Sequence, residues 1–403
     1  MNLKHLTILL IIFSIAGIDM VQAQTTGSVP NEWVDASTGH RIIRLTRREG
    51  DNQSFYFHNN PFIKSADGKS DKMVFVGSTE GGSQYFTVDL VSLQIEQLTT
   101  TALGARNEIV ARKHREVVYQ IKDSVFATHI DTRKTRLLCV FPKNTKGRIT
   151  SINADETLLA GSYEETDSAQ KILKAYPQKS QYFSRIYNAK LPYCLFTINI
   201  QTGEYKKIHR ENTWLNHVQF SPVNPDLLMF CHEGNWEKVD RIWVINIKTG
   251  DVRLMHKRTM DREIAGHEFW SWDGKTIWFD LQTPRSVNFN LAGVDYETGK
   301  EIRYAHTRDE WSIHYNISLK QDLFCGDGGD STQVAKAKDG MWIYLFRPDG
   351  DRFKAERLVN MSKHGYKLEP NVHFSPDGKW IIFRSNMFGP INVFAVEIEK
   401  AKF

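Results

Sequence analysis

One template recurs along the whole chain and constrains its fold more than any other feature. The template is a short strand rich in aromatic and β-branched residues, a polar turn that often reads Asp-Gly, and a second strand. The copies lie roughly 40 to 70 residues apart, a period typical of repeat architectures. The seven copies are FIKSADGKSDKMVFVG, NEIVARKHREVVYQI, ITSINADETLLAG, HVQFSPVNPDLLMFC, HEFWSWDGKTIWFD, IHYNISLKQDLFCG and VHFSPDGKWIIFRSN.

Two further strands joined by a Gly-bearing turn follow most copies, as in TINIQTGEYKKI and IWVINIKTGDVRLM. Four strands per repeat, with almost no amphipathic helix between them, predict an all-β fold, a seven-bladed β-propeller. The last repeat has only three strands, whereas HRIIRLT at 40–46 has no partner nearby. We therefore expect this N-terminal strand to complete the seventh blade, which removes an exposed sheet edge.

The N-terminus has the pattern of a secretory signal peptide. Lys4 precedes an apolar run, and Val21-Gln22-Ala23 places small residues where a signal peptidase reads. We expect a signal peptide at 1–23 and a single propeller domain at 24–403 in a periplasmic or secreted protein. The apolar run is shorter than the ~20 residues that span a bilayer, and no later stretch approaches that length, so we do not expect a membrane-spanning protein.

Composition narrows the possible partners. The net charge of +5 is mild and suits an anionic ligand, but the basic residues are spread along the chain, which argues against nucleic acid. The four cysteines show no CxxC spacing and sit beside apolar runs. Buried free thiols are therefore favoured over a disulfide or zinc framework. No obligate protein partner is implied.

Polar residues begin the innermost strands of several repeats. The position six residues before the turn is occupied in four successive repeats by His217, His267, His314 and Asn371. Strands within a blade alternate in direction, so all four positions fall at the same mouth of the central channel. One histidine there would more often be structural, but three at equivalent positions favour a ligand-binding pocket.

The loops on that predicted face carry further polar groups. CHEGNWEKVDRIW at 231–243 joins the second and third strands of one repeat and carries His232, Glu233 and Arg241. A long insertion at 163–193 occupies the same place in the preceding repeat. Its cations are either a solvated charged surface or part of a lid over an anionic sugar: Lys171, Lys174, Lys179 and Arg185.

Together, CHEGNW, VDRIWVIN, GHEFW, FCGDGGD and the insertion before CLFTINIQTGE resemble the oligogalacturonate lyases. That family consists of seven-bladed propellers that cleave short pectin fragments by β-elimination. The resemblance runs in order from about residue 34 to the end of the chain. It implies His267 as the catalytic base and Arg241 as the assisting arginine.

The resemblance also implies a divalent metal, usually manganese, bound by a histidine that corresponds to His314. The family's remaining ligands come from a Gln-x-x-His-x-His segment, where this chain has Tyr366, Glu369 and Asn371. Oxygens of Glu369 and Asn371, with His314 and water, could still hold Mn²⁺ or Ca²⁺. The alternative is a metal-free pocket in which these groups bind sugar hydroxyls.

The predicted function is cleavage of acidic, uronate-containing, pectin-type oligosaccharides by β-elimination to 4,5-unsaturated products. His267 would take the C5 proton, because a neutral imidazole titrates near neutral pH, and Arg241 would neutralise the C6 carboxylate. His232, His217, Glu233 and Arg185 are the predicted substrate-binding residues, and His314, Glu369 and Asn371 the predicted metal ligands. The alternative is a non-catalytic propeller that binds glycans or a protein. A serine hydrolase is excluded because no G-x-S-x-G elbow is present.

Overall fold

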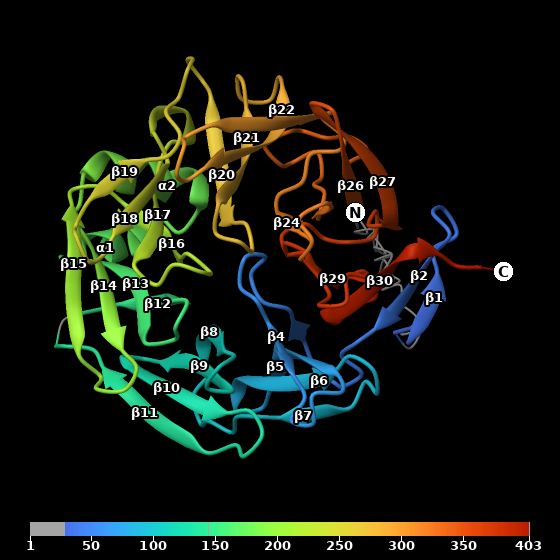
Figure 1. Ribbon diagram of the computed structural model, residues 1–403, viewed down its shortest axis with the longest axis horizontal. Helices are drawn as coiled ribbons and strands as arrows, with labels where there is room; N and C mark the ends of the chain where they lie inside the picture. Colours follow the sequence, from blue (N-terminus) through green and yellow to red (C-terminus); the bar gives the residue numbers. More distant parts are fainter. Residues whose placement is uncertain (1–28, 144, 403) are drawn as a thin grey trace, which may run out of the picture.

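The computed structural model describes residues 29–143 and 145–402, and Figure 1 shows their strands arranged as a ring around a central axis. The predicted signal peptide lies outside the described residues. Six hydrogen-bonded sheets are present among them, and the eight-stranded one consists of two four-stranded halves joined by a single parallel bridge, Ala305 with Arg352. Counting these halves separately, we interpret the ring as seven blades.

Each blade is an antiparallel meander whose first strand lies nearest the axis. The blades and their strands follow the chain. Blade 1 contains β3 (Asn52–Gln53), β4 (Phe62–Lys64), β5 (Asp71–Thr79), β6 (Gly82–Asp89) and β7 (Ile95–Gln97). Blade 2 contains β8 (Arg106–Ala111), β9 (Glu116–Ile121), β10 (Ser124–His129) and β11 (Thr135–Val140). Blade 3 contains β12 (Arg148–Ile152), β13 (Leu158–Glu164), β14 (Tyr193–Asn199) and β15 (Tyr205–Glu211).

The later blades repeat the pattern. Blade 4 contains β16 (Leu215–Phe220), β17 (Leu227–His232), β18 (Ile242–Asn246) and β19 (Val252–Leu254). Blade 5 contains β20 (Ile264–Trp270), β21 (Thr276–Gln282), β22 (Phe289–Asp295) and β23 (Glu301–His306). Blade 6 contains β24 (Tyr315–Ile317), β25 (Phe324–Gly326), β26 (Trp342–Asp349) and β27 (Arg352–Asn360). Blade 7 contains β28 (His373–Phe374), β29 (Trp380–Ser385) and β30 (Asn392–Lys400).

The N-terminal strand closes the ring as the sequence predicts. β2 (His40–Arg44) pairs antiparallel with β30, and β1 (Glu32–Val34) adds one more strand outside it. Ile42 of β2 is fully buried in the cluster that blade 7 shares with blade 6. The edge of the last blade is therefore covered by a segment more than three hundred residues away in sequence, which ties the two ends of the domain together.

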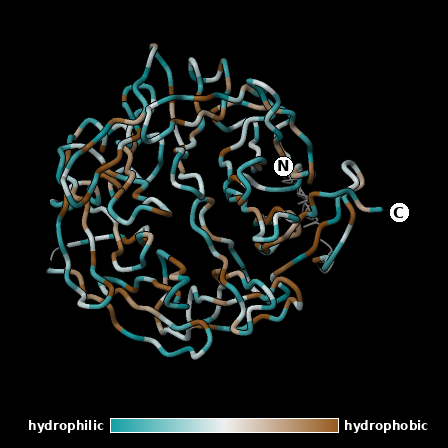
Figure 2. The backbone as a smooth tube through the Cα atoms, in the orientation of Figure 1, coloured by the Kyte–Doolittle hydropathy of each residue, from teal (hydrophilic) through white to brown (hydrophobic). Residues whose placement is uncertain are grey.

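The hydrophobic core is divided among the blade interfaces instead of gathered at one centre. Figure 2 shows hydrophobic stretches distributed around the ring. Each of seven buried clusters joins two consecutive blades, and the one containing Phe75 and Ile382 joins blade 1 to blade 7. Alternating side chains on both faces of a blade fill these interfaces, and the axis is left to polar groups.

All four cysteines are free and buried, as the sequence predicts. Within residues 29–143 and 145–402, the helices are too short or too polar to cross a membrane. Two helices, α1 (Ser168–Ala175) and α2 (Lys179–Ala189), form the insertion between β13 and β14, and a single 3₁₀ turn, η1 (Trp236–Lys238), lies in the loop before β18.

The innermost strand of blade 1 is interrupted, and this interruption shapes the functional face. β3 and β4 both pair with β5, but the segment 54–61 between them leaves the sheet and runs into the centre of the ring (Figure 1). The Phe57 N–H donates to Asn371 Oδ1 at 2.9 Å, and Asn316 Nδ2 donates to the Phe57 carbonyl at 2.9 Å. This axial segment is thus held from blades 6 and 7 and divides the channel into two cavities.

Candidate active site

Bulges at the start of the inner strands turn polar side chains toward the axis. His217 and His267 have left-handed backbones, with φ of 47° and 53°, and the pairing with the second strand shifts register at both places. Asn371, at the start of blade 7, has a φ of 52°. A non-glycine residue in this conformation costs on the order of 1–3 kcal/mol, and such strain concentrates at functional sites. The shared conformation brings the predicted ring of polar residues to the channel mouth.

These residues open into a cavity on the side of the ring that carries the loops between second and third strands. Its walls come from blades 4 to 7, the axial segment and helix α2. The lining residues are Tyr56, Lys179, Phe183, His217, Glu233, Trp236, Arg241, Ile264, Ala265, Gly266, His267, Asp280, Val334 and Glu369. The structure thus brings His217, His267, Glu233, Arg241 and Glu369 together, as the sequence predicts.

Arg241 is held inside this wall by two carboxylates. Its Nε donates to Glu268 Oε2 at 2.9 Å, and its Nη1 donates to Glu233 Oε1 at 2.9 Å. Burial alone would raise the pKa of Glu233, but the Arg241 guanidinium and His217 bring it down to about 2. The pKa of Glu268 is also lowered, against the effect of burial, chiefly by Arg241. Arg241 is therefore a cation that is already paired with two carboxylates of the wall.

His267 has the properties of a neutral base. Its Nδ1 is buried without a hydrogen-bond partner among the described residues. Burial lowers its pKa well below the ordinary value, and the nearby His314, His217, Arg241 and Lys179 lower it further. An imidazole in this environment is unprotonated at neutral pH and keeps a lone pair available for a proton.

His217 lies beside the two carboxylates that hold Arg241. Its Nδ1 is 3.7 Å from Glu268 Oε1, and its Nε2 is 3.9 Å from Glu233 Oε2. Burial lowers its pKa, against the pull of Glu268. At these distances water or a ligand hydroxyl could bridge His217 to either carboxylate.

His314 is oriented by a buried carboxylate. Its Nδ1 lies 2.8 Å from Asp327 Oδ2, and both side chains are fully buried. Its Nε2 has no hydrogen-bond partner among the described residues and lies 3.7 Å from Glu369 Oε2. A carboxylate behind the imidazole fixes the tautomer and leaves the other nitrogen as a lone-pair donor, an arrangement common for metal-binding histidines. The ring of His267 is close by, with centroids 4.9 Å apart.

Asn371 has a structural role in place of the predicted metal ligation. Its Oδ1 accepts the Phe57 N–H, and its Nδ2 donates to the Glu369 carbonyl at 3.0 Å. Tyr366 also points elsewhere, since its hydroxyl donates to the Asp327 carbonyl at 3.1 Å. In residues 29–143 and 145–402 no cluster of three or more His, Cys, Asp or Glu forms a complete metal site. His314 and Glu369 are therefore the two predicted ligands that remain able to bind a cation.

Two predicted substrate-binding residues lie outside the cavity. His232 stacks on Trp243 with ring centroids 4.8 Å apart, and its Nε2 is 3.0 Å from Glu211 Oε2 in blade 3. Its side chain lies at the interface with blade 3, outside the residues that line the cavity. Arg185 is exposed on α2, where its guanidinium lies over the Tyr176 ring. Both expectations are corrected.

Lys179 takes the place that Arg185 was expected to fill. It begins α2, and its Nζ lies 5.4 Å from the centre of the Trp236 ring and 5.6 Å from that of Phe183. The insertion is thus a lid over one wall of the cavity. Lys179 was one of four cations that the sequence analysis singled out in the insertion. Only the folded insertion shows that Lys179 and Arg185 lie on different sides of α2.

Tyr56, Glu268 and Asp327 are site residues that sequence reasoning missed. The signal for Glu268 was present, since it follows His267 in the HEFW motif, and that for Asp327 was the CGDGGD loop. Tyr56 lies in a stretch that matches no repeat template. That mismatch was the only sequence sign that the segment leaves the sheet.

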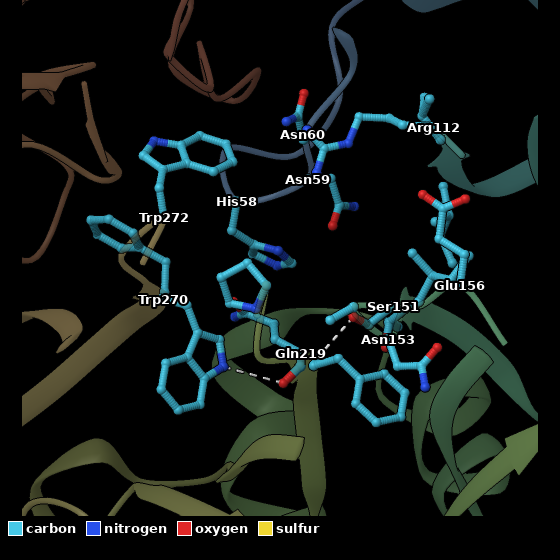
Figure 3. A pocket seen from close by; sticks show the side chains of 18 of the residues that line it. His58, Asn59, Asn60, Arg112, Ser151, Asn153, Glu156, Gln219, Trp270 and Trp272 are labelled. Atoms are coloured by element: carbon cyan, nitrogen blue, oxygen red, sulfur yellow. Dashed lines mark hydrogen bonds between the residues drawn. The ribbon is translucent and has the colours of Figure 1, made fainter. Parts of the chain in front are cut away.

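A second cavity lies below the axial segment, at the other end of the axis (Figure 3). His58, Asn59 and Asn60 of the segment enter it, together with Arg112 and Trp272. The axial segment thus presents Tyr56 to the upper cavity and the three residues after Phe57 to the lower one. The candidate active site is therefore a pocket with a floor, not an open channel.

The fold and this pocket define the class: a β-propeller whose axial cavity combines a neutral imidazole, a buried Arg–carboxylate cluster and an oriented histidine. The oligogalacturonate lyase family model matches residues 29–401, and the chain belongs to this family. It is 25% identical over 385 residues to an oligogalacturonate lyase from Dickeya dadantii, covering 90% of this chain and 95% of that one. An oligogalacturonide lyase from Pectobacterium atrosepticum is 24% identical with the same coverage.

Solved structures show the same fold. An oligogalacturonate lyase in complex with manganese superposes with a TM-score of 0.79 at 23% identity, covering 92% of this chain and 96% of that one. An oligogalacturonate lyase from Vibrio parahaemolyticus gives a TM-score of 0.77 at 22% identity, with the same shares covered. These likenesses confirm the predicted all-β propeller class.

Proposed function

We propose that the protein cleaves acidic, pectin-type oligosaccharides by β-elimination, with His267 as the base. The observation that carries the proposal is the environment of His267: an unprotonated imidazole with an unpartnered nitrogen, beside the cavity wall formed by Arg241. Membership of the oligogalacturonate lyase family supports the same substrate class.

The reaction requires removal of the C5 proton of a uronate unit, which is weakly acidic because the neighbouring carboxylate is already negative. A neutral imidazole near this proton acts as general base, and general base catalysis contributes about 10²–10⁴-fold to the rate. Arg241 lines the cavity, and its N–H groups that Glu233 and Glu268 do not engage would orient the carboxylate of the sugar. Glu233 and Glu268 hold the guanidinium rigidly in place.

The charges of the cavity support a bound cation. Lys179 and Arg241 are outnumbered by three carboxylates, Glu233, Glu268 and Glu369, so the pocket has no spare positive charge for an acidic sugar. His314 and Glu369 are the residues that would hold a divalent metal, with water and substrate oxygens as the other ligands. A metal there would withdraw charge from the substrate carboxylate. Manganese is the ion in one related structure, whereas calcium would use only oxygen ligands such as the Glu369 carboxylate.

The test is product formation. Purified protein is incubated with oligogalacturonates and other acidic oligosaccharides, and ultraviolet absorbance reports the 4,5-unsaturated product. We expect turnover by the natural protein and a loss of about 10²–10⁴-fold in His267→Ala. His232→Ala is the matched control, because this histidine lies outside the cavity. Near-normal turnover in His267→Ala would overturn the assignment of the base.

The proposal includes export. The pattern at 1–23 is that of a signal peptide, and a periplasmic or secreted location suits digestion of oligosaccharides outside the cytoplasm. Sequencing the N-terminus of the protein purified from an expressing bacterium tests this. Cleavage after Ala23 supports export, and an intact N-terminus in the cytoplasmic fraction contradicts it.

A further inference from the structure

Tyr56 forms part of the floor of the active-site cavity and is held there from several sides. Its ring centroid is 5.0 Å from that of His314 and 6.0 Å from that of His217. The His373 Nε2 lies 3.3 Å from the Tyr56 carbonyl oxygen, and the next residue is fixed by Asn371 and Asn316. The phenol is therefore positioned by backbone contacts and does not depend on its own hydroxyl.

The hydroxyl of Tyr56 has no hydrogen-bond partner among the described residues, although the residue lines the cavity. By comparison, the hydroxyls of Tyr344 and Tyr366 each donate to a carbonyl oxygen. A positioned donor without an acceptor in a polar cavity is a group that a ligand would complete. An unperturbed tyrosine hydroxyl has a pKa of about 10. The phenol therefore keeps its proton at neutral pH.

β-Elimination needs such a donor. As the C4–O bond breaks, its electron pair passes to the glycosidic oxygen, which is a poor leaving group unless it is protonated. Asp280 also lines the cavity and retains a proton, but its side chain is almost wholly buried and its Oδ2 accepts from Gln282 Nε2. The remaining polar groups of the cavity are less suited to this task. His267 and His217 are unprotonated, and the Arg241 guanidinium does not release its protons. The Lys179 ammonium lies over the rings of Phe183 and Trp236 in the lid.

We propose that Tyr56 is the general acid that protonates the departing glycosidic oxygen. The inference rests on the proposed function. His267 accepts the C5 proton, and the electrons of the C5–H bond form the C4=C5 double bond. The C4–O bond breaks, and the Tyr56 O–H passes its proton to the leaving oxygen, which becomes the new reducing-end hydroxyl. Water then returns a proton to the phenolate, and His267 loses its proton to solvent.

The experiment compares two substrates in Tyr56→Phe, which keeps the ring and removes the hydroxyl. The first substrate is an oligogalacturonate, whose leaving group needs a proton. The second is a synthetic galacturonate with a nitrophenoxy group at C4, which leaves as a stable anion. We expect kcat on the oligogalacturonate to fall about 10²-fold or more, and kcat on the nitrophenoxy substrate to stay within a few-fold of the natural protein.

A purely positioning role for Tyr56 would lower both rates equally, and that result would overturn the inference, as would unchanged turnover of the oligogalacturonate. Tyr205→Phe is the matched control, because Tyr205 lies in β15 of blade 3, outside the cavity lining. Near-ultraviolet circular dichroism and thermal unfolding confirm that Tyr56→Phe is folded. If the natural protein releases no unsaturated product from either substrate, the proposed function fails, and this inference fails with it. If Tyr56→Phe affects the two substrates equally while the natural protein releases unsaturated product, this inference fails and the proposed function stands.

Discussion

Arg241 of blade 4 and Glu268 of blade 5 form a buried ion pair, with Nε and Oε2 2.9 Å apart and both side chains almost wholly shielded from solvent. Glu268 follows His267 directly, so this pair fixes the backbone that carries the proposed base. The second carboxylate, Glu233, reaches the same guanidinium from the loop after β17. The same three side chains thus stabilise the interface between blades 4 and 5 and fix the wall of the cavity.

Removing the guanidinium is expected to destabilise the fold. Arg241→Met leaves two buried carboxylates without a cation, and breaking a buried pair in this way costs about 3–5 kcal/mol. Urea unfolding measures the free energy of unfolding directly. Arg241→Lys should lose less stability, since the charge remains, but should turn over poorly, because an ammonium cannot reproduce the planar fork. A variant Arg241→Met that unfolds at the same urea concentration as the natural protein contradicts this account.

The lid residue Lys179 is expected to act on substrate binding. Lys179→Met removes a cation from the cavity wall, so KM for an acidic oligosaccharide should rise several-fold while kcat changes less. Arg185→Met is the control, since this cation lies on the same helix but points to solvent. Steady-state kinetics at two salt concentrations measures both. An equal rise in KM for both substitutions would contradict a specific role of Lys179 in substrate binding.

The Asp327–His314 contact is expected to set metal affinity. Asp327→Asn removes the carboxylate that orients the imidazole, and changes of this kind typically cost 10–100-fold in metal affinity. Isothermal titration calorimetry with Mn²⁺ measures the change without reference to turnover. Asp330→Asn, in the same loop but bonded to Thr332, should bind Mn²⁺ as the natural protein does. If the natural protein binds no Mn²⁺ or Ca²⁺, the cation site is absent and the metal-free alternative holds.

Asp280 is expected to make stability depend on pH. Burial raises the pKa of this carboxyl to about 7, whereas the unfolded chain has an ordinary value near 3.8. Between these two values the folded state retains a proton that the unfolded state has released, so the free energy of unfolding falls as pH rises from about 4 to 7 and is then level. This difference in pKa between the folded and unfolded states corresponds to at most about 4 kcal/mol.

Asp280→Asn should remove this dependence, so its stability relative to the natural protein increases with pH over that window. Thermal unfolding at pH 4, 5.5 and 8 checks the trend, and Asp349→Asn at an exposed position should show none. A relative stability that decreases with pH would mean that Asp280 is charged in the folded protein.

The repeat predicted much of what the structure shows. Strand, turn and strand at a fixed period are local properties of the sequence, because alternation and turn chemistry act over a few residues. The same register placed His217, His267 and Asn371 at equivalent positions, and the structure gives these three residues the same left-handed backbone. The missing fourth strand of the last repeat also predicted that β2 completes it.

The partners of each polar group were decided only by the tertiary structure. Arg241 was expected to neutralise the substrate carboxylate, but its own loop places Glu233 against it and the neighbouring blade adds Glu268. His232 and Arg185 were expected in the cavity, yet the side chain of His232 faces blade 3 and that of Arg185 is exposed on α2. Tyr56 enters the site because residues 54–61 leave their blade and bond to Asn371 and Asn316, more than two hundred residues later. Sequence periodicity determines which residues face the axis, whereas contacts across the axis form between segments distant in sequence and depend on the geometry of the closed ring.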